Sequence, residues 1–326
     1  MVDTAVSTVA RPALLRDYLA LVRPTQWVKN VVVFAGPAAA MKLFSPDSFG
    51  RAAIAFVAFC LAASATYAIN DVVDRQADAS HPLKRHRPVA RGAVSPGAGY
   101  VLGVVLIVLA IALATLALNG AVTIVVAAYF ALTVTYSLAL KRWMILDVIA
   151  IATGFVLRAW AGSLAVGVAT SEWLVACMFT LCLFLGFGKR RCELAMIGNA
   201  GDAGQHRETL IRYTPELLSH LIAVSAGIAV MTFLLYTVDS SGSTSPVHRE
   251  DLFYTLPIVV YGIFRYAMVT ELGRHSGPTE IVLHDRPLLA AILMWAAVAL
   301  IIVYQASLFG PQGLRGVLRW LGWELG

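Results

Sequence analysis

Charged residues are scarce in this sequence. Asp, Glu, Lys and Arg make up 13% of its 326 residues, against about a quarter in soluble domains. Hydrophobic residues make up 59%, and the mean hydropathy is +0.75. A soluble core of this length would not need so much apolar material. The scarcity of charge therefore argues against an ordinary soluble domain and predicts an integral membrane protein.

Several common signatures of soluble enzymes and secreted domains are also missing. The four cysteines form no Cys-x-x-Cys pair, which argues against a disulfide framework or a zinc site. The seven histidines show no His-x-x-x-His spacing, and the sequence contains no P-loop, nucleophile elbow or Gly-x-Gly-x-x-Gly motif. Residues 1–10 have neither the basic start nor the apolar core of a secretory signal peptide, so we expect the first hydrophobic segment to remain and to cross the membrane.

Long apolar runs recur along the whole chain. A membrane-spanning helix needs about 20 apolar residues, and the sequence offers about nine runs of suitable length. We therefore predict an all-α integral membrane protein, a helical bundle that forms a single polytopic domain over residues 1–326. The predicted spans are 27–43, 52–69, 97–118, 121–140, 144–166, 172–188, 217–238, 252–271 and 287–309.

Most of the 25 Lys and Arg residues fall on one side of the predicted membrane. That side holds the N-terminal segment 1–26 and two long loops, 70–96 and 189–215. The positive-inside rule makes it cytoplasmic, which leaves the C-terminus outside. The tail 311–326 has the pattern of a helix lying in the outer interface. The isoelectric point of ≈ 9.2 therefore reflects basic residues that orient the chain in the membrane and bind phosphate groups. We expect no nucleic-acid partner.

The stretch Asn70–Asp78 carries the strongest functional signal. If the helix that precedes it continues, Asp71, Asp74 and Asp78 share one face at i, i+3 and i+7. Stacked carboxylates repel one another unless a cation lies between them, and Mg²⁺ prefers such oxygen ligands together with water and substrate phosphates. We predict that these aspartates, assisted by Asn70, bind Mg²⁺ and a diphosphate and are catalytic. The alternative is a solvated helix end whose acids balance nearby bases.

Basic residues follow the aspartates directly. A cation beside a metal-binding acidic face suits a diphosphate leaving group, because it takes up the charge that develops as the group departs. The alternative is that these bases only fix the orientation of the loop. The candidate substrate-binding residues here are Lys84, Arg85, Arg87 and Arg91.

A second basic cluster lies where the sixth predicted span meets the cytoplasm. It would suit a second phosphate group, with its carboxylate orienting the cations or sharing a metal. Its alternative role is again the orientation of the chain. The cluster consists of Lys189, Arg190, Arg191 and Glu193.

Single polar residues in or beside the predicted spans are further candidates. Arg158 lies midway along its span, where a charge usually faces a cavity or has a partner, and Asp147 lies on the same face. Lys29 starts the first span and would form a wall of the cytoplasmic mouth, and Tyr136 lies near the cytoplasmic end of the fourth span.

Residues 280–287, just before the last predicted span, can be interpreted in two ways. Pro287 is suited to the first turn of a helix, and Asp285 would cap that helix without any chemical role. Arg286 could instead face the substrate cavity. The sequence does not separate these readings.

The acidic motif, the number of spans and the two long loops resemble the UbiA superfamily of intramembrane prenyltransferases. The resemblance implies a central cavity open sideways to lipid, in which the motif Asn70–Asp78 binds Mg²⁺ and a diphosphate. Members of that family usually carry a second Asp-rich motif after the sixth span. Here the run Lys189-Arg190-Arg191-x-Glu193 occupies that place, which implies an anionic second substrate instead of a neutral aromatic ring.

The runs 23–30, 188–193 and 285–287 resemble one branch of this superfamily in particular. Its members transfer 5-phosphoribose from phosphoribosyl diphosphate (PRPP) to decaprenyl phosphate in the bacterial plasma membrane, for arabinan and cell-wall synthesis. The alternative is an ordinary polyprenyl transferase with an aromatic acceptor. A transporter is a third reading, which the short and weakly charged outer loops disfavour. Isoprenoid length and homo-oligomer formation stay open.

Overall fold

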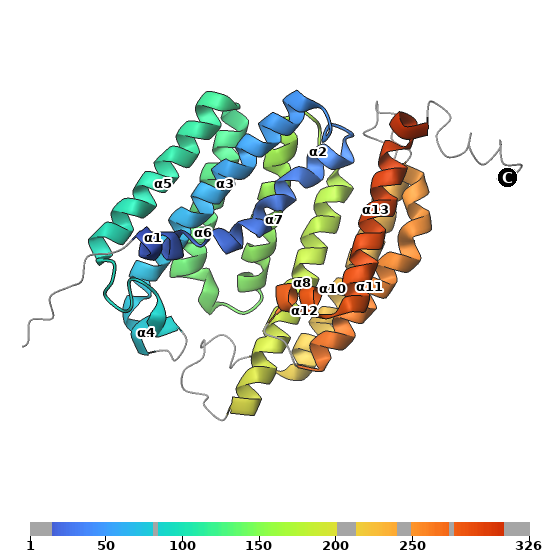
Figure 1. Ribbon diagram of the computed structural model, residues 1–326. Helices are drawn as coiled ribbons and strands as arrows, with labels where there is room; N and C mark the ends of the chain where they lie inside the picture. The colour runs from blue at the N-terminus through green and yellow to red at the C-terminus, as the bar shows by residue number, and fades with distance from the viewer. Residues whose placement is uncertain (1–14, 81–83, 201–212, 240–248, 274–276, 310–326) are drawn as a thin grey trace, which may run out of the picture. The chain divides into compact units, whose positions relative to one another are not determined.

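The computed structural model describes residues 15–80, 84–200, 213–239, 249–273 and 277–309, and within those ranges every regular element is helical (Figure 1). Eight helices are long and apolar enough to cross a membrane. This confirms the predicted all-α, multi-pass class. The eight are α3 (Pro46–Val73), α5 (Pro96–Ala117), α6 (Gly120–Leu138), α7 (Leu146–Ala165), α8 (Glu172–Ala200), α10 (Pro215–Val238), α11 (Leu256–Glu271, counted with the 3-10 helix η5, Arg249–Thr255) and α13 (Arg286–Phe309).

The first predicted span, 27–43, is not one long α-helix. It divides into a 3-10 helix, η1 (Pro24–Phe34), and the short α2 (Ala35–Ala39). A 3-10 run of 11 residues is unusual. Three successive β-branched residues, 31–33, lower the α-helical propensity there, and side-chain hydrogen bonds hold η1 in place. The described residues therefore contain eight candidate spans, where the sequence predicted about nine.

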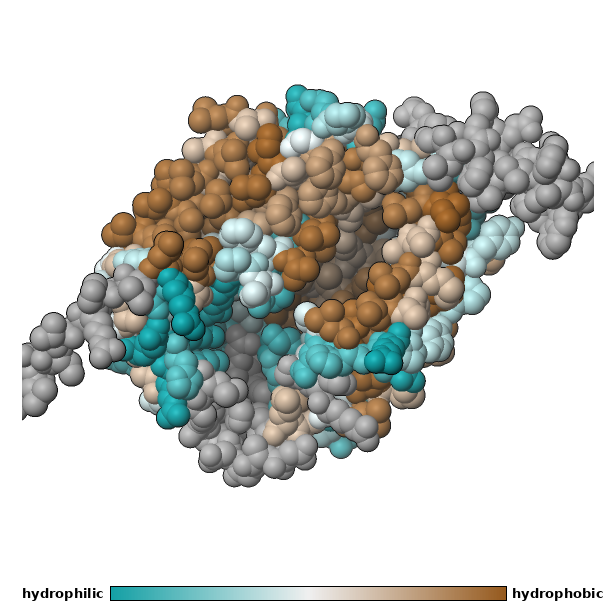
Figure 2. Space-filling view, viewed as in Figure 1, coloured by the Kyte–Doolittle hydropathy of each residue, from teal (hydrophilic) through white to brown (hydrophobic). Residues whose placement is uncertain are grey.

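The chain forms two compact units, and each is described by itself. The first comprises the described residues up to Val31 together with Ile54–Ser137. It contains most of α3, the helices α5 and α6, and the short elements α1 (Leu15–Val22), α4 (Arg75–Ser80) and η2 (Lys84–His86). In Figure 2 apolar residues cover α5, whereas hydrophilic residues gather around α4.

Helix α5 approaches α3 closely at two glycines. A Cβ atom on Gly99 would lie 2.6 Å from Val72 Cγ2, and one on Gly103 would lie 2.7 Å from Ile69 Cγ1. Glycines four residues apart are a common way for membrane helices to pack closely. The contact places α5 against the end of α3 that leads into the acidic motif.

The second unit comprises Val32–Ala53 and the described residues from Leu138 onwards. It contains α2, α7, α8, α10, α11, α12 (Pro278–His284), α13 and the 3-10 helix η3 (Leu140–Arg142). Helix α8 packs along both α10 and α7, around a buried core that includes Phe184 and Leu218. Helix α8 continues to Ala200, so the first part of the predicted loop 189–215 is helical. The predicted tail 311–326 lies outside the described residues.

Gly162 on α7 allows the closest backbone approach in this unit. A Cβ atom there would lie 1.7 Å from the carbonyl oxygen of Val33, which is backbone and cannot rotate away. We expect Gly162→Ala to lower the free energy of unfolding by about 1–3 kcal/mol or more, as overpacking of a buried contact does. Thermal unfolding of the purified protein in detergent measures the effect.

Gly227 on α10 provides the matched control, because a Cβ atom there meets nothing within 4 Å. Gly227→Ala should leave stability unchanged or raise it slightly, since alanine favours the helix by about 0.8–1 kcal/mol. A Gly162→Ala protein as stable as the parent would contradict the close contact between residues 33 and 162.

Candidate functional site

The acidic motif lies across the junction of α3 and α4, in the first unit. The N–H of Asp74 donates to the carbonyl oxygen of Asn70, and the N–H of Asp78 donates to that of Asp74, both at 2.8 Å. The helical register therefore continues through the turn, which is the condition on which the shared face of the three aspartates depended. The side chains of Asp71 and Asp78 are buried, whereas Asn70 and Asp74 are partly exposed.

Two arginines hold the buried carboxylates. Asp71 Oδ1 accepts hydrogen bonds from Arg23 Nη2 at 2.5 Å and from Arg87 Nη1 at 3.1 Å. The same Arg87 nitrogen donates to Asp78 Oδ2 at 2.7 Å. A single guanidinium thus bridges two aspartates that are seven residues apart, and a second guanidinium, that of Arg23 between α1 and η1, also pairs with Asp71.

The donor set fits a divalent ion that shares its coordination with a substrate. Within the described ranges no three Asp, Glu, His or Cys side chains lie close enough together to hold one metal ion. However, Asp71 Oδ2 is buried and accepts no hydrogen bond from those residues. Mg²⁺ commonly takes one or two carboxylates and completes its shell with water and phosphate oxygens. Asp71 and Asp78 would supply two such carboxylates, and ligation by these residues, Asp74 and Asn70 stays a prediction.

Arg23 is a site residue that the sequence did not single out by itself. Its backbone is in the left-handed region, with φ of 54°, and its guanidinium also lies 5.0 Å from the centre of the Tyr67 ring. The sequence signal that could have indicated Arg23 was its place between the end of a helix and Pro24, because a proline restricts the backbone conformation of the residue before it. Its partner is 48 positions away in the sequence, so no local pattern indicated the pairing.

A set of hydrogen bonds fastens the segment that carries Arg23 to α3. Ser64 Oγ donates to the carbonyl oxygen of Val22 at 2.9 Å and accepts from Trp27 Nε1 at 3.0 Å. Asn30 Nδ2 donates to Cys60 Sγ at 3.2 Å. These bonds place Arg23 beside Asp71. Lys29, which lies in the same 3-10 helix, is half-buried.

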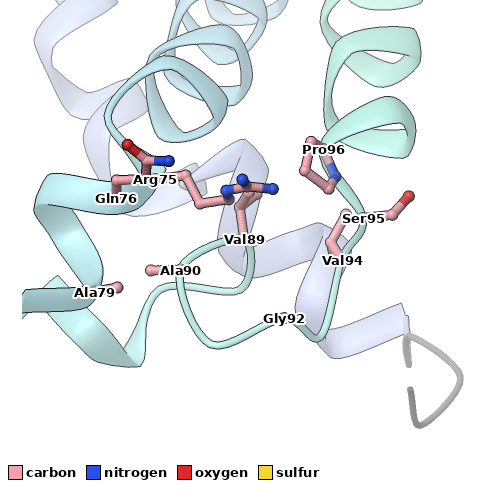
Figure 3. Close-up of a pocket in the computed structure, with 9 residues that line it drawn as sticks. All are labelled: Arg75, Gln76, Ala79, Val89, Ala90, Gly92, Val94, Ser95 and Pro96. Atoms are coloured by element: carbon pink, nitrogen blue, oxygen red, sulfur yellow. The ribbon is translucent and has the colours of Figure 1, made fainter. Parts of the chain in front are cut away.

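The other basic residues after the motif are spread over different surroundings. Lys84 and Arg85 are exposed on η2, and Arg91 pairs with Asp17 of α1. A pocket of ≈ 380 Å³ lies beside α4, and the side chain of Arg75 extends across it towards Val89 and Pro96 (Figure 3). Arg87 of the predicted cluster contacts the carboxylates of Asp71 and Asp78.

The second basic cluster lies on α8 and is divided between buried and accessible side chains. Arg190 is 3% exposed, and its Nε lies 2.9 Å from Oδ2 of the fully buried Asp147 of α7. Arg190 also pairs with Glu193. Lys189 is more accessible, with Nζ 3.6 Å from Glu193 Oε1, and Arg191 forms an ion pair of 2.8 Å with Glu271.

Tyr213 completes the buried network around Asp147. Its hydroxyl donates to Asp147 Oδ1 at 3.1 Å and accepts from the N–H of Ile145 at 2.6 Å. Burial raises the pKa of Tyr213 to about 12, so the hydroxyl stays protonated and keeps donating at neutral pH. The network joins the starts of α7 and α10 to α8, which favours a structural role for Arg190 over direct phosphate binding.

The remaining candidates occupy varied environments in the described structure. Arg158 is buried within α7, where it donates to the carbonyl oxygen of Gly154 at 2.8 Å and lies over the Phe155 ring. Tyr136 is half-buried near the end of α6, and Arg286 is exposed at the start of α13.

Asp285 takes the structural role that one reading of the sequence gave it. Its Oδ1 accepts from the N–H of Leu288 at 2.9 Å, which caps α13. Its carboxylate also pairs with Arg265 of α11, with Nη2 2.8 Å from Oδ2. The capping prediction is therefore confirmed.

Comparison with known proteins identifies the class. The chain belongs to the UbiA prenyltransferase family, whose pattern matches residues 31–282. It is 36% identical over 290 residues to the decaprenyl-phosphate phosphoribosyltransferase of Corynebacterium glutamicum, and the match covers 88% of this chain and 86% of that relative. It is 33% identical over 305 residues to the enzyme of that name from Mycolicibacterium smegmatis, with 90% and 95% covered.

Solved structures support the same fold. A UbiA homologue from Archaeoglobus fulgidus bound to DMAPP and Mg²⁺ superposes with a TM-score of 0.67 at 17% identity, and the match covers 88% of this chain and 99% of that one. The same homologue bound to GPP and Mg²⁺ gives a TM-score of 0.66. At this level of identity the likeness concerns the fold alone.

Proposed function

We propose that this protein transfers 5-phosphoribose from PRPP to decaprenyl phosphate and releases pyrophosphate. The observation that carries the proposal is the 36% identity to a decaprenyl-phosphate phosphoribosyltransferase over 88% of this chain and 86% of the relative. The family match from 31 to 282 contains both the acidic motif and the basic run of α8. A polyprenyl transferase with an aromatic acceptor is not favoured by these relatives.

The first unit would bind the diphosphate of PRPP. Asp71 and Asp78, with Asp74 and Asn70, would hold Mg²⁺, which supplies charge neutralisation to the diphosphate when bound. Arg23 and Arg87 both pair with Asp71, and Arg87 also pairs with Asp78, so their remaining N–H groups would donate to diphosphate oxygens. Exposed bases nearby would add to the positive field that attracts the anion. These are Lys84, Arg85 and Arg91.

The second unit would bind the other phosphate groups. Lys189 and Arg191 are the more accessible cations of α8, and they would hold the 5-phosphate of PRPP or the phosphate of the lipid. Arg190 and Glu193 would keep that end of the helix in place. Lys29, Tyr136, Arg158 and Arg286 stay candidates for substrate contact.

The proposed transfer reaction does not need a strong general base. The bond between C1 of the ribose and the diphosphate oxygen breaks, the electron pair leaves with pyrophosphate, and C1 gains oxocarbenium character. An oxygen of the lipid phosphate then forms the new bond to C1 from the opposite face. That oxygen is already ionised, so no proton has to be removed. Stabilisation of the departing charge by fixed cations is the protein's main contribution.

The topology follows from the distribution of basic residues. We propose that the N-terminus and both basic clusters face the cytoplasm, where PRPP is available, and that the C-terminus lies outside a bacterial plasma membrane. The isoprenoid tail would lie against apolar helices within the membrane. The product would supply phosphoribose for arabinan in the cell wall.

Radiolabelled PRPP distinguishes the candidates. With purified protein, Mg²⁺ and decaprenyl phosphate, we expect label in the lipid fraction and one pyrophosphate released for each labelled lipid. Turnover only with a polyprenyl diphosphate and an aromatic acid would contradict the proposal. Uptake of unchanged substrate into proteoliposomes, without a labelled lipid, would instead indicate a transporter.

A further inference from the structure

Two of the three aspartates of the motif, Asp71 and Asp78, already form ion pairs within the protein. Asp71 has an exposed side-chain fraction of 1%, and Asp78 one of 4%, so neither carboxylate relies on water. Two guanidinium groups, from Arg23 and Arg87, balance these two negative charges. Buried charges need partners of this kind, because desolvating an unpaired carboxylate is strongly unfavourable.

The position of Arg87 is the important detail. Its Nη1 lies between Asp71 Oδ1 at 3.1 Å and Asp78 Oδ2 at 2.7 Å, which is the kind of bridging position that a cation takes between two carboxylates. A divalent ion without a bound anion would approach two carboxylates whose charges the arginines already balance. The oxygens that face each other, Asp71 Oδ1 and Asp78 Oδ2, already accept hydrogen bonds from Arg87. The two arginine side chains are about a quarter exposed, so they have room to turn towards an incoming anion.

We infer that Arg23 and Arg87 act as counter-cations that keep free divalent ions out of the acidic motif, and that they release its carboxylates when a diphosphate draws the guanidinium groups away. Both would contact the diphosphate, and they govern when Asp71 and Asp78 become available. The inference rests on the metal and diphosphate part of the proposed function. It makes divalent-ion binding dependent on the anion, a coupling between two ligands at one site.

Mn²⁺ binding to the purified full-length protein in detergent tests this inference. The signal of free Mn²⁺ in electron paramagnetic resonance reports metal affinity without any turnover. With Mn²⁺ alone, we expect Arg87→Gln to bind the ion about tenfold more tightly than the parent protein. Filter binding of radiolabelled inorganic pyrophosphate in the presence of Mn²⁺ should show the opposite change, a loss of about tenfold.

Arg75→Gln is the matched control. It removes the same charge from the same short segment, but Arg75 extends across the pocket beside α4 and is exposed (Figure 3). Exposed charges are screened by salt, so the Mn²⁺ affinity of this variant should stay within about twofold of the parent. Arg23→Gln, which acts on Asp71 alone, should also raise Mn²⁺ affinity and serves if Arg87→Gln does not fold.

Opposite changes in metal and pyrophosphate affinity support the inference, because simple structural damage would weaken both. Unchanged or weaker Mn²⁺ binding in folded Arg87→Gln or Arg23→Gln protein would overturn it. Neither probe contains ribose or lipid. A failure of lipid labelling with PRPP would therefore overturn the proposed transfer reaction without affecting the Mn²⁺ result.

Discussion

Asp71→Asn is expected to reduce transfer of label from PRPP to decaprenyl phosphate by about a thousandfold. The substitution keeps the shape of the side chain but removes the negative charge that faces two guanidinium groups. It also replaces one carboxylate oxygen with an amide nitrogen, which cannot ligate Mg²⁺. Because the arginines are partly exposed and can be hydrated, the protein should still fold. Initial rates at saturating Mg²⁺ measure the effect.

The control for this variant lies at the other end of the same helix. Asp47 is 82% exposed at the start of α3 and forms a 3.4 Å ion pair with Arg51, one turn away. Asp47→Asn makes the same chemical change outside the motif and should leave the rate unaltered, since exposed pairs contribute little. Near-normal turnover by folded Asp71→Asn protein would remove this residue from the catalytic machinery.

Asp147→Ala is expected to lower the free energy of unfolding by about 3–5 kcal/mol. The substitution leaves Arg190, which is 3% exposed, without its nearest carboxylate on α7, and it removes the acceptor of the Tyr213 hydroxyl. Breaking one side of a buried ion pair is costly because the remaining charge stays desolvated. Unfolding of the purified protein by heat or by titration with a denaturing detergent measures the loss.

A second ion pair from the neighbouring arginine gives the comparison. Arg191 pairs with Glu271, which is 45% exposed, so Glu271→Ala should cost at most about 1 kcal/mol. The double variant Asp147→Ala with Arg190→Met should recover part of the lost stability, because it removes the buried charge that has lost its partner on α7. If Asp147→Ala were no less stable than Glu271→Ala, the buried pair would not be the structural link we describe.

The helical class and most of the spans could be predicted because the bilayer imposes a simple rule. Every backbone group must be satisfied within the segment, so apolar runs of sufficient length become helices. The same local logic allowed a continuous helical register through Asn70–Asp78 and gave the Asp285 cap as one of two readings, and the structure shows both features. Each of these features depends on residues within a few positions of one another.

Features that depend on distant residues were not predictable in this way. Arg23 meets Asp71 across 48 positions, and Arg190 meets Asp147 of another helix. The first predicted span became η1 and α2 because tertiary contacts, such as the approach of Gly162 to Val33, override an apolar run that looks regular in sequence. The periodicity of apolar residues along the sequence does not indicate which distant residues will contact one another.

The uninterrupted helix α8 has a geometric consequence for its basic run. Successive residues of an α-helix are about 100° apart, so residues two positions apart project to nearly opposite sides. Lys189 reaches along its own helix towards Glu193, whereas Arg191 reaches Glu271 of α11. The two cations therefore extend towards different partners in this structure. If the run binds phosphate as we propose, we accordingly expect Lys189 and Arg191 to be able to contact two different anionic groups from one helix.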